Sequence, residues 1–203
     1  MNVKQLPNNE VFIIPEHYME LEPAPGDPPY TTPYGYQGKA LKAFALVYPI
    51  DVSGSMPFGH PEILITGIHQ QLGEEQGLIA VKDGKTKAGR EYIYSIVKTL
   101  KGKGMGVQYN LTMHIFFGTY VMNITVFFDE DMITGVRDTQ VYSYMMNEGI
   151  IKGPDEWCRD PYDADYKKGI LMNRSEEEQF DKDFPWHPLT EARNFVKFVV
   201  ENN

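Results

Sequence analysis

The feature that most constrains the fold is an alternation of apolar and polar residues in two consecutive segments, 107–117 and 120–128. Apolar side chains occupy the odd positions of the first segment and the even positions of the second. A period of two is typical of a strand that buries one face. A two-residue turn beginning at Gly118 would produce this change of parity, because glycine readily adopts the positive φ of such turns. The sequence therefore predicts an antiparallel hairpin in which Phe117 opposes Tyr120.

Other segments extend this hairpin into a larger unit. Apolar runs predict three more strands, at 11–14, 39–50 and 90–100. Helical spacing of apolar residues predicts three helices, at 61–72, 131–146 and 188–200. Asp131 is expected to cap the second of these helices. Five prolines between 22 and 38 favour an extended loop in that segment.

These elements predict an α+β fold, in which helices pack on one antiparallel sheet to form an α/β/α sandwich. The core is expected to include Ile65, Ile68, Leu72 and the odd positions of 107–117. We predict a sandwich domain at 1–149, followed at 150–203 by an acidic, irregular extension. The amphipathic helix at the end of this extension is expected to pack on the domain, because Leu189, Ala192, Val196 and Val199 share one of its faces.

Composition excludes several classes of protein. A net charge of −9 and a sequence pI near 5.0 argue against nucleic-acid binding, which needs a clustered excess of Lys and Arg. Cys158 is the only cysteine, so an internal disulfide and multi-cysteine metal sites are excluded. The sequence shows no signal-peptide core and no apolar segment long enough to span a bilayer. We therefore expect a cytoplasmic protein that binds neither nucleic acid nor membrane.

The stretch from Asp51 to Ser55 raises the question of a metal site. Asp51, Ser53 and Ser55 form a D-x-S-x-S pattern after a predicted strand, which resembles the magnesium site of von Willebrand factor A domains. That family places its site at the carboxyl edge of a parallel sheet, whereas the hairpin at 107–128 requires antiparallel pairing. We predict a Ser-Gly turn without a metal. The alternative is a metal-dependent, adhesion-type binding protein.

The polar side of the predicted hairpin is the best candidate for a binding site. It carries Asn110, Thr112, His114, Asn123 and Thr125. Polar groups edged by apolar residues are typical of a ligand-binding cleft. The same mixture is also typical of the solvated face of an antiparallel sheet.

Two smaller candidates are better explained as ordinary structure. Asp160, Asp163 and Asp165 could attract calcium, but their spacing departs from the calcium-binding loop, and Asp-Pro is typical of a turn. His69 stands on a predicted helix with no second ligand one turn away.

Seven basic residues between 82 and 103 could attract an acidic partner or the acidic extension of the chain itself.

No pattern in the sequence supports catalysis. It contains no Walker loop, zinc pattern or dinucleotide fingerprint, and Cys158 has no partner that would activate a thiolate. We expect no cofactor. The leading hypothesis is a non-catalytic binding or adaptor protein with a protein partner. The alternative is an enzyme with a site around His114, together with Asp129 or Asp131.

The order of elements resembles the PsbP-like superfamily. Residues 11–18, VFIIPEHY, form a short strand that ends in proline, and a strand, a helix, an antiparallel meander and a closing helix follow up to 147. The resemblance implies an α/β/α sandwich and a binding role. Members of this superfamily include extrinsic photosystem subunits, a nuclear-import factor that binds a small GTPase, and bacterial chaperones for secreted effectors. It transfers no site residue to this chain, but it makes a chaperone-like function one form of the hypothesis.

Overall fold

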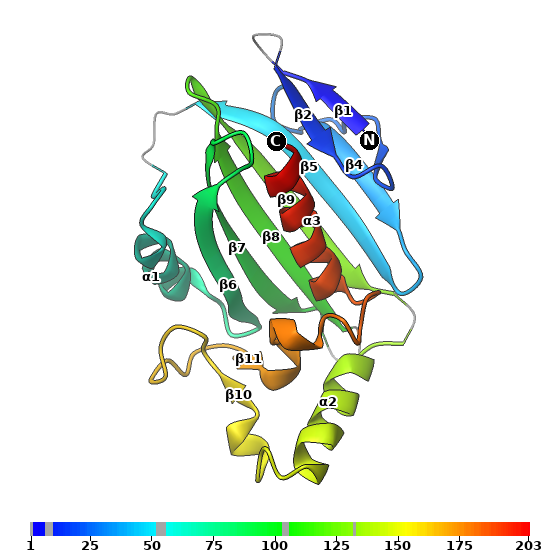
Figure 1. Cartoon of the computed structure of the whole chain (residues 1–203), viewed down its shortest axis with the longest axis vertical. Helices are drawn as coiled ribbons and strands as arrows, with labels where there is room; N and C mark the ends of the chain where they lie inside the picture. Colours follow the sequence, from blue (N-terminus) through cyan, green and yellow to red (C-terminus); the bar gives the residue numbers. More distant parts are fainter. Residues whose placement is uncertain (1, 7–9, 52–55, 103–105, 132) are drawn as a thin grey trace.

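The computed structural model describes residues 2–6, 10–51, 56–102, 106–131 and 133–203. Its main feature is a seven-stranded antiparallel sheet with the order β3-β4-β5-β9-β8-β7-β6 (Figure 1). The strands are β3 (Met19–Glu20), β4 (Thr32–Gln37), β5 (Leu41–Asp51), β6 (Gln76–Lys85), β7 (Glu91–Leu100), β8 (Val107–Phe116) and β9 (Tyr120–Glu130). The predicted α+β class with one large antiparallel sheet is confirmed.

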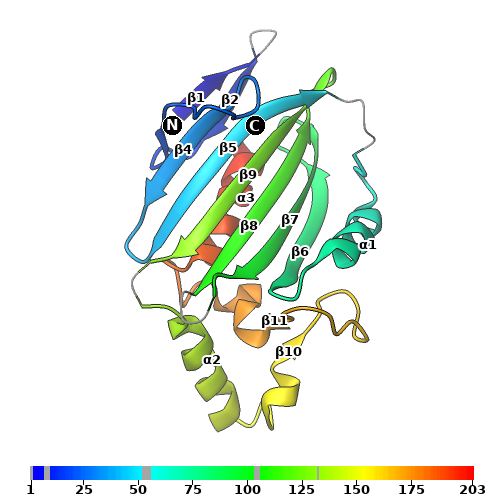
Figure 2. The same ribbon diagram turned by 180° about the vertical axis from the view of Figure 1, so that it is seen from behind.

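Other elements lie on both faces and at one end of this sheet. The helix α3 (Pro188–Asn202) covers one face, next to a hairpin of β1 (Asn2–Gln5) and β2 (Val11–Ile14) (Figure 1). Figure 2 shows the opposite face, where α1 (Pro61–Gln71) lies beside β6. The helix α2 (Val136–Asn147) and the short strands β10 (Cys158–Arg159) and β11 (Met172–Asn173) lie beyond the end of the sheet. Within the described residues, 3-10 turns lie at Pro154–Glu156, Arg174–Glu176 and Glu178–Phe180.

The predicted hairpin is confirmed in position and register. The amide of Phe117 donates to the carbonyl of Tyr120 over 2.9 Å, and Ile115 lies opposite Met122. Gly118 has a φ of 79°, as the two-residue turn requires. The apolar face that follows from this register is buried beneath α3.

The core between the sheet and α3 is almost entirely apolar. Leu189, Ala192, Phe195 and Val199 of α3 are at most 1% exposed. They pack with buried residues of the hairpin such as Leu111, Met113 and Val126. A hydroxyl group also enters this region, because Tyr18 donates to the carboxylate of Glu191 over 3.1 Å.

Three local predictions were wrong. The strand β6 was missed because it contains Asp83-Gly84, a pair typical of turns. Within the strand, Tyr92 lies over Gly84. A Cβ at this position would stand only 3.0 Å from the Tyr92 hydroxyl oxygen, so glycine leaves room for the Tyr92 ring. The segment 32–37 forms β4 rather than a loop. Its Pro33 is tolerated because β3 pairs only with Tyr34 and Gly35, which leaves most of β4 close to an edge.

The third wrong prediction concerns the start of α2. The helix begins at Val136. Its N-cap residue is Gly135, which has a φ of 73°. Asp131 does not cap it, because its carboxylate instead lies 3.1 Å from Lys42 Nζ and accepts from Gln37 over 2.9 Å.

In α1, Leu72 at the C-cap is buried, while Ile65 and Ile68 are only partly buried against it.

Buried polar contacts attach the extension to the sheet. Lys98 Nζ lies 2.7 Å from Glu176 Oε2, and the Tyr109 hydroxyl donates to Glu176 Oε1 over 3.0 Å. The side chains of Lys98 and Glu176 are 6% and 1% exposed. Lys82 also pairs with Glu178. Part of the basic cluster predicted from the sequence therefore binds the acidic extension.

The extension also covers the outer edge of β6. The hydroxyl of Tyr162 accepts from the Val81 amide over 2.6 Å and donates to the Val81 carbonyl over 3.0 Å. Farther along, the amide of Ile170 donates to the carbonyl of Gln76 over 3.0 Å. A side chain and a loop thus occupy backbone groups that another strand could otherwise use.

Candidate functional site

Four of the predicted polar residues, Thr112, His114, Asn123 and Thr125, lie together on the sheet face opposite α3. His114 on β8 is paired with Asn123 on β9, and Thr112 is paired with Thr125. The Asn123 amide donates to the Thr125 hydroxyl over 3.1 Å. The hairpin register therefore places these side chains in one polar patch, as the alternation in the sequence predicted.

His114 is the titratable group of this patch. Burial lowers the pKa of its imidazole below the usual value, so the ring is neutral near pH 7. No hydrogen bond or ion pair joins His114 to a carboxylate within the described residues. A general base usually needs a second group that orients it, and the patch does not supply one.

Asn110 lies apart from His114 in a small cavity beside α1. The cavity has a volume of about 270 Å³, and Thr112, Ser95 and Ile68 also line it. The side-chain amide of Asn110 donates to the Thr99 hydroxyl over 3.1 Å. Its Oδ1 atom is buried without a hydrogen-bond partner in the described part of the chain. Such an acceptor can receive a hydrogen bond from a bound molecule.

Partly exposed apolar side chains surround the polar patch on β5 and β9. Phe44 is 40% exposed, and Leu46, Tyr48 and Phe127 are half-buried on the same side of the sheet. Among the described elements, no helix lies over β5 and β9 on this side (Figure 2). We call this surface the open face; it consists of Phe44, Leu46, Tyr48, Asn110, Thr112, His114, Asn123, Thr125 and Phe127.

The D-x-S-x-S pattern cannot be assembled from the described residues. Asp51 is the exposed last residue of β5, paired with Tyr120. Ser53 and Ser55 lie outside the described residues. Across the described ranges, no group of three or more His, Cys, Asp or Glu side chains is placed to hold a metal ion.

The acidic loop at 160 forms a turn, as predicted from Asp-Pro. The Asp160 carboxylate accepts from the amides of Tyr162 and Asp163, both over 2.9 Å. It also lies 2.9 Å from His69 Nε2, and the His69 ring stacks on Tyr166 with centroids 4.1 Å apart. Asp160 and His69 thus connect the extension to α1.

Cys158 is exposed, and burial of its neighbourhood raises the pKa of the thiol.

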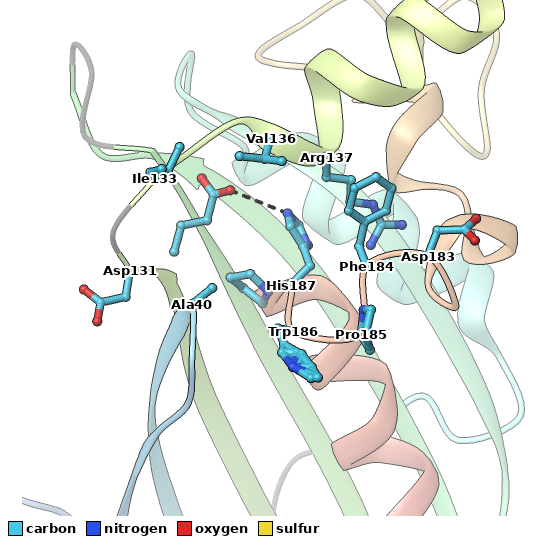
Figure 3. Close-up of a pocket in the computed structure, with 12 residues that line it drawn as sticks. Ala40, Asp131, Ile133, Val136, Arg137, Asp183, Phe184, Pro185, Trp186 and His187 are labelled. Carbon is cyan, nitrogen blue, oxygen red and sulfur yellow. Dashed lines mark ion pairs between the residues drawn. The ribbon is translucent and has the colours of Figure 1, made fainter.

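A pocket that the sequence did not predict lies between α2 and α3. Its volume is about 390 Å³, and three separate segments form its wall. Figure 3 shows these segments: the turn at Ala40, the connection from β9 to α2, and the residues that precede α3. The lining residues are Ala40, Glu130, Asp131, Ile133, Val136, Arg137, Asp183, Phe184, Pro185, Trp186, His187 and Pro188.

The inner wall of this pocket contains a buried histidine and carboxylate. His187 Nε2 lies 3.6 Å from Glu130 Oε1, and both side chains are 9% exposed. The other ring nitrogen, Nδ1, accepts from the Leu189 amide over 3.2 Å and so caps α3. Burial alone would raise the pKa of the Glu130 carboxyl, but the nearby His187 ring and a hydrogen bond from the Gly135 amide hold it below its usual value. Glu130 is therefore a carboxylate at neutral pH.

Arg137 lies behind the pocket, and four of the five N–H groups of its guanidinium donate to protein oxygens. Nε donates to the Ser175 carbonyl over 2.7 Å, and Nη1 donates to the Thr190 hydroxyl over 3.1 Å. Nη2 donates to the Glu177 carbonyl and to the Asp181 carboxylate over 3.2 and 2.9 Å. At 1% exposure, Arg137 joins α2 to the extension.

The mouth of the pocket is apolar. Ile133 is 78% exposed, and Trp186 is 38% exposed. The Lys39 ammonium lies 4.2 Å from the centre of the Trp186 ring, which is within the range of a cation–π contact. One sequence signal marks this region: the run of aromatic residues and prolines in FPWHP before the last helix. Its partners at 130–137 are distant in sequence, so the pocket itself could not be predicted.

Comparisons with known proteins add little to this description. No protein-family model matches the chain, and no curated protein is significantly similar to it. Among solved structures, it is similar to PA94 from Pseudomonas aeruginosa, a protein of unknown function suggested to be a regulator. The two chains share 13% identity over 68% of this chain and 99% of the other, with a TM-score of 0.36. This similarity is too weak to indicate an activity.

Proposed function

We propose that this chain is a non-catalytic binding or adaptor protein, and that its open face binds an apolar segment of a partner protein. One observation carries the proposal: Phe44, Leu46, Tyr48 and Phe127 remain partly exposed next to one another on β5 and β9. Contiguous apolar surface of this kind is typical of interaction sites.

The polar patch gives this surface its selectivity. A partner that covers the open face must place hydrogen-bonding groups opposite His114, Thr112 and Asn123, because an unmatched buried polar group costs about 1–3 kcal/mol. A purely apolar partner therefore binds less well than one that carries a few polar side chains in register. The proposed PsbP-like relationship agrees with such a role and remains part of the proposal.

The proposal makes a direct prediction for partner capture. Wild-type protein used as bait in the source cell should recover one stoichiometric protein, whereas Phe44→Lys should lose it. The lysine places a charge in the middle of the apolar surface, and its desolvation opposes binding. A matched control is Ile133→Lys, which changes an apolar residue that is more exposed and lies away from the open face.

Three outcomes separate this proposal from its rival. Loss of the partner in Phe44→Lys and retention in Ile133→Lys supports the open face. Equal capture by both variants contradicts it. If no partner is recovered, and the protein turns over a substrate from the source cell in a reaction that His114→Ala abolishes, the result would instead favour an enzyme. Circular dichroism and thermal melting of Phe44→Lys and Ile133→Lys should match those of the wild type, because both replaced side chains are at least 40% exposed.

A further inference from the structure

We propose that the pocket between α2 and α3 binds a small organic amine, with its apolar body inside the pocket and its ammonium at the mouth near Trp186. This inference does not depend on the proposed function, because the pocket lies beyond the end of the sheet and shares no residue with the open face (Figure 3). It rests on the walls, on the availability of polar groups and on the cation already present at the mouth.

The walls require an apolar ligand. Phe184, Trp186, Ile133 and Val136 line the pocket from opposite sides. Ile133, Val136 and Trp186 are 78%, 40% and 38% exposed, so a ligand can remove apolar surface from water on several sides at once. A volume of about 390 Å³ is within the range of sites for small molecules.

The polar atoms of the wall select against an anion. Four of the five N–H groups of the Arg137 guanidinium donate to protein oxygens, and the side chain is buried. One nitrogen of His187 accepts from the Leu189 amide, and the other faces Glu130. A bound carboxylate or phosphate would therefore find at most one N–H of the buried Arg137 guanidinium and no free donor on His187. It would also meet the carboxylates of Glu130, Asp183 and Asp131, the last of which is paired with Lys42.

The same wall favours a cation. Carboxylate oxygens are acceptors for an ammonium group, and Trp186 presents a ring face that already attracts one. At present Lys39 holds that position, with Nζ 4.2 Å from the ring centre. Lys39 is exposed, so it can move into solvent when a ligand ammonium replaces it. The lysine thus shows where the ligand charge belongs and also competes for that place.

The test uses three ligands of one shape and different charge. Phenethylamine, 2-phenylethanol and phenylacetate are titrated into the full-length chain at pH 7 by isothermal titration calorimetry. The amine should bind saturably and about tenfold more tightly than the alcohol, as expected for a partly desolvated cation–π contact. Phenylacetate should bind least well.

Variants locate the site and the competing lysine. Trp186→Ala should lose most of the amine binding. Lys39→Ala should bind the amine about threefold more tightly, since a surface cation–π contact no longer has to be displaced. The matched control is Lys167→Ala, another exposed lysine, whose ammonium donates to the Ala164 carbonyl outside the pocket. In a Trp157→Phe background, Trp186 is the only tryptophan, so its fluorescence should change with the same midpoint.

Several results would overturn the proposal. They are an absence of saturable amine binding, equal affinity for phenylacetate, and unchanged affinity in Trp186→Ala. Equal binding of Nα-acetyl-lysine amide, which has a cation but no aromatic body, would contradict the apolar requirement and point to a basic side chain of a partner. None of these results depends on capture of a protein at the open face.

Discussion

The contact of α3 with the sheet and the contact of residues 150–187 with α2 and the sheet bury side chains by opposite means. Beneath α3, Leu189, Phe195 and Val199 are at most 1% exposed and meet other apolar residues. At the second contact, Arg137 and Glu176 are both 1% exposed and are held by hydrogen bonds and ion pairs. Apolar contacts tolerate gradual change, whereas buried charges depend on each partner. This difference predicts how each region responds to mutation.

Removal of the apolar contact should have the largest effect. Truncation after Phe184 deletes α3, in which each of Leu189, Phe195 and Val199 contributes roughly 1.5–3 kcal/mol of burial. Domain stabilities are about 5–15 kcal/mol, so the truncated chain should be insoluble or lose cooperative thermal unfolding. A truncated chain with an unchanged melting temperature would mean that α3 does not stabilise the sheet.

A single change in the polar contact should have the next largest effect. Lys98→Met leaves the Glu176 carboxylate buried without its cation, and the free energy of unfolding should fall by about 3–5 kcal/mol. Chemical denaturation of the purified variant measures this loss.

The double variant distinguishes pairing from apolar packing. Lys98→Met with Glu176→Leu removes both charges and should recover much of the stability that the single change loses. Tyr109 would lose its acceptor in this variant, so recovery should be incomplete. Additive losses would show that the two side chains do not act as a pair.

A single apolar truncation should have a smaller and additive effect. Leu189→Ala should lower the free energy of unfolding by about 2–5 kcal/mol through lost burial and a residual cavity. Combined with Lys98→Met, its effect should add, because Leu189 contacts the apolar core and Lys98 pairs with the extension. Strong coupling between the two changes would mean that the two regions form one cooperative contact.

The smallest effect concerns His114. Its pKa is lowered by burial in the folded chain, while an unfolded histidine titrates near about 6.5. As the pH falls below that value, the unfolded chain binds a proton that the folded chain resists, and stability decreases. His114→Gln should therefore reduce the loss of stability between neutral and mildly acidic pH. If the free energy of unfolding falls equally with decreasing pH in the wild type and in His114→Gln, the assignment to His114 is contradicted.

The two contacts also differ in how well the sequence predicted them. Residues 107–128 and 188–200 carry periodic apolar patterns, and a pattern reveals both the element and its buried face. The contacts of Arg137 and Glu176 have no such signature, because charged residues are normally read as solvent-exposed. The polar patch around His114 followed from the hairpin register. The pocket at Trp186 did not, because it needs segments that lie about fifty residues apart in the chain.

The contact of Tyr162 with Val81 has a consequence for the growth of the sheet. Antiparallel sheets are extended by any chain that can exchange backbone hydrogen bonds with an edge strand. Here a phenol performs that exchange at the centre of β6, and it offers no further backbone group on its outer side. Tyr162 therefore acts as a terminator at this point of the edge: it satisfies the outward backbone groups of Val81 without providing a template for the next strand.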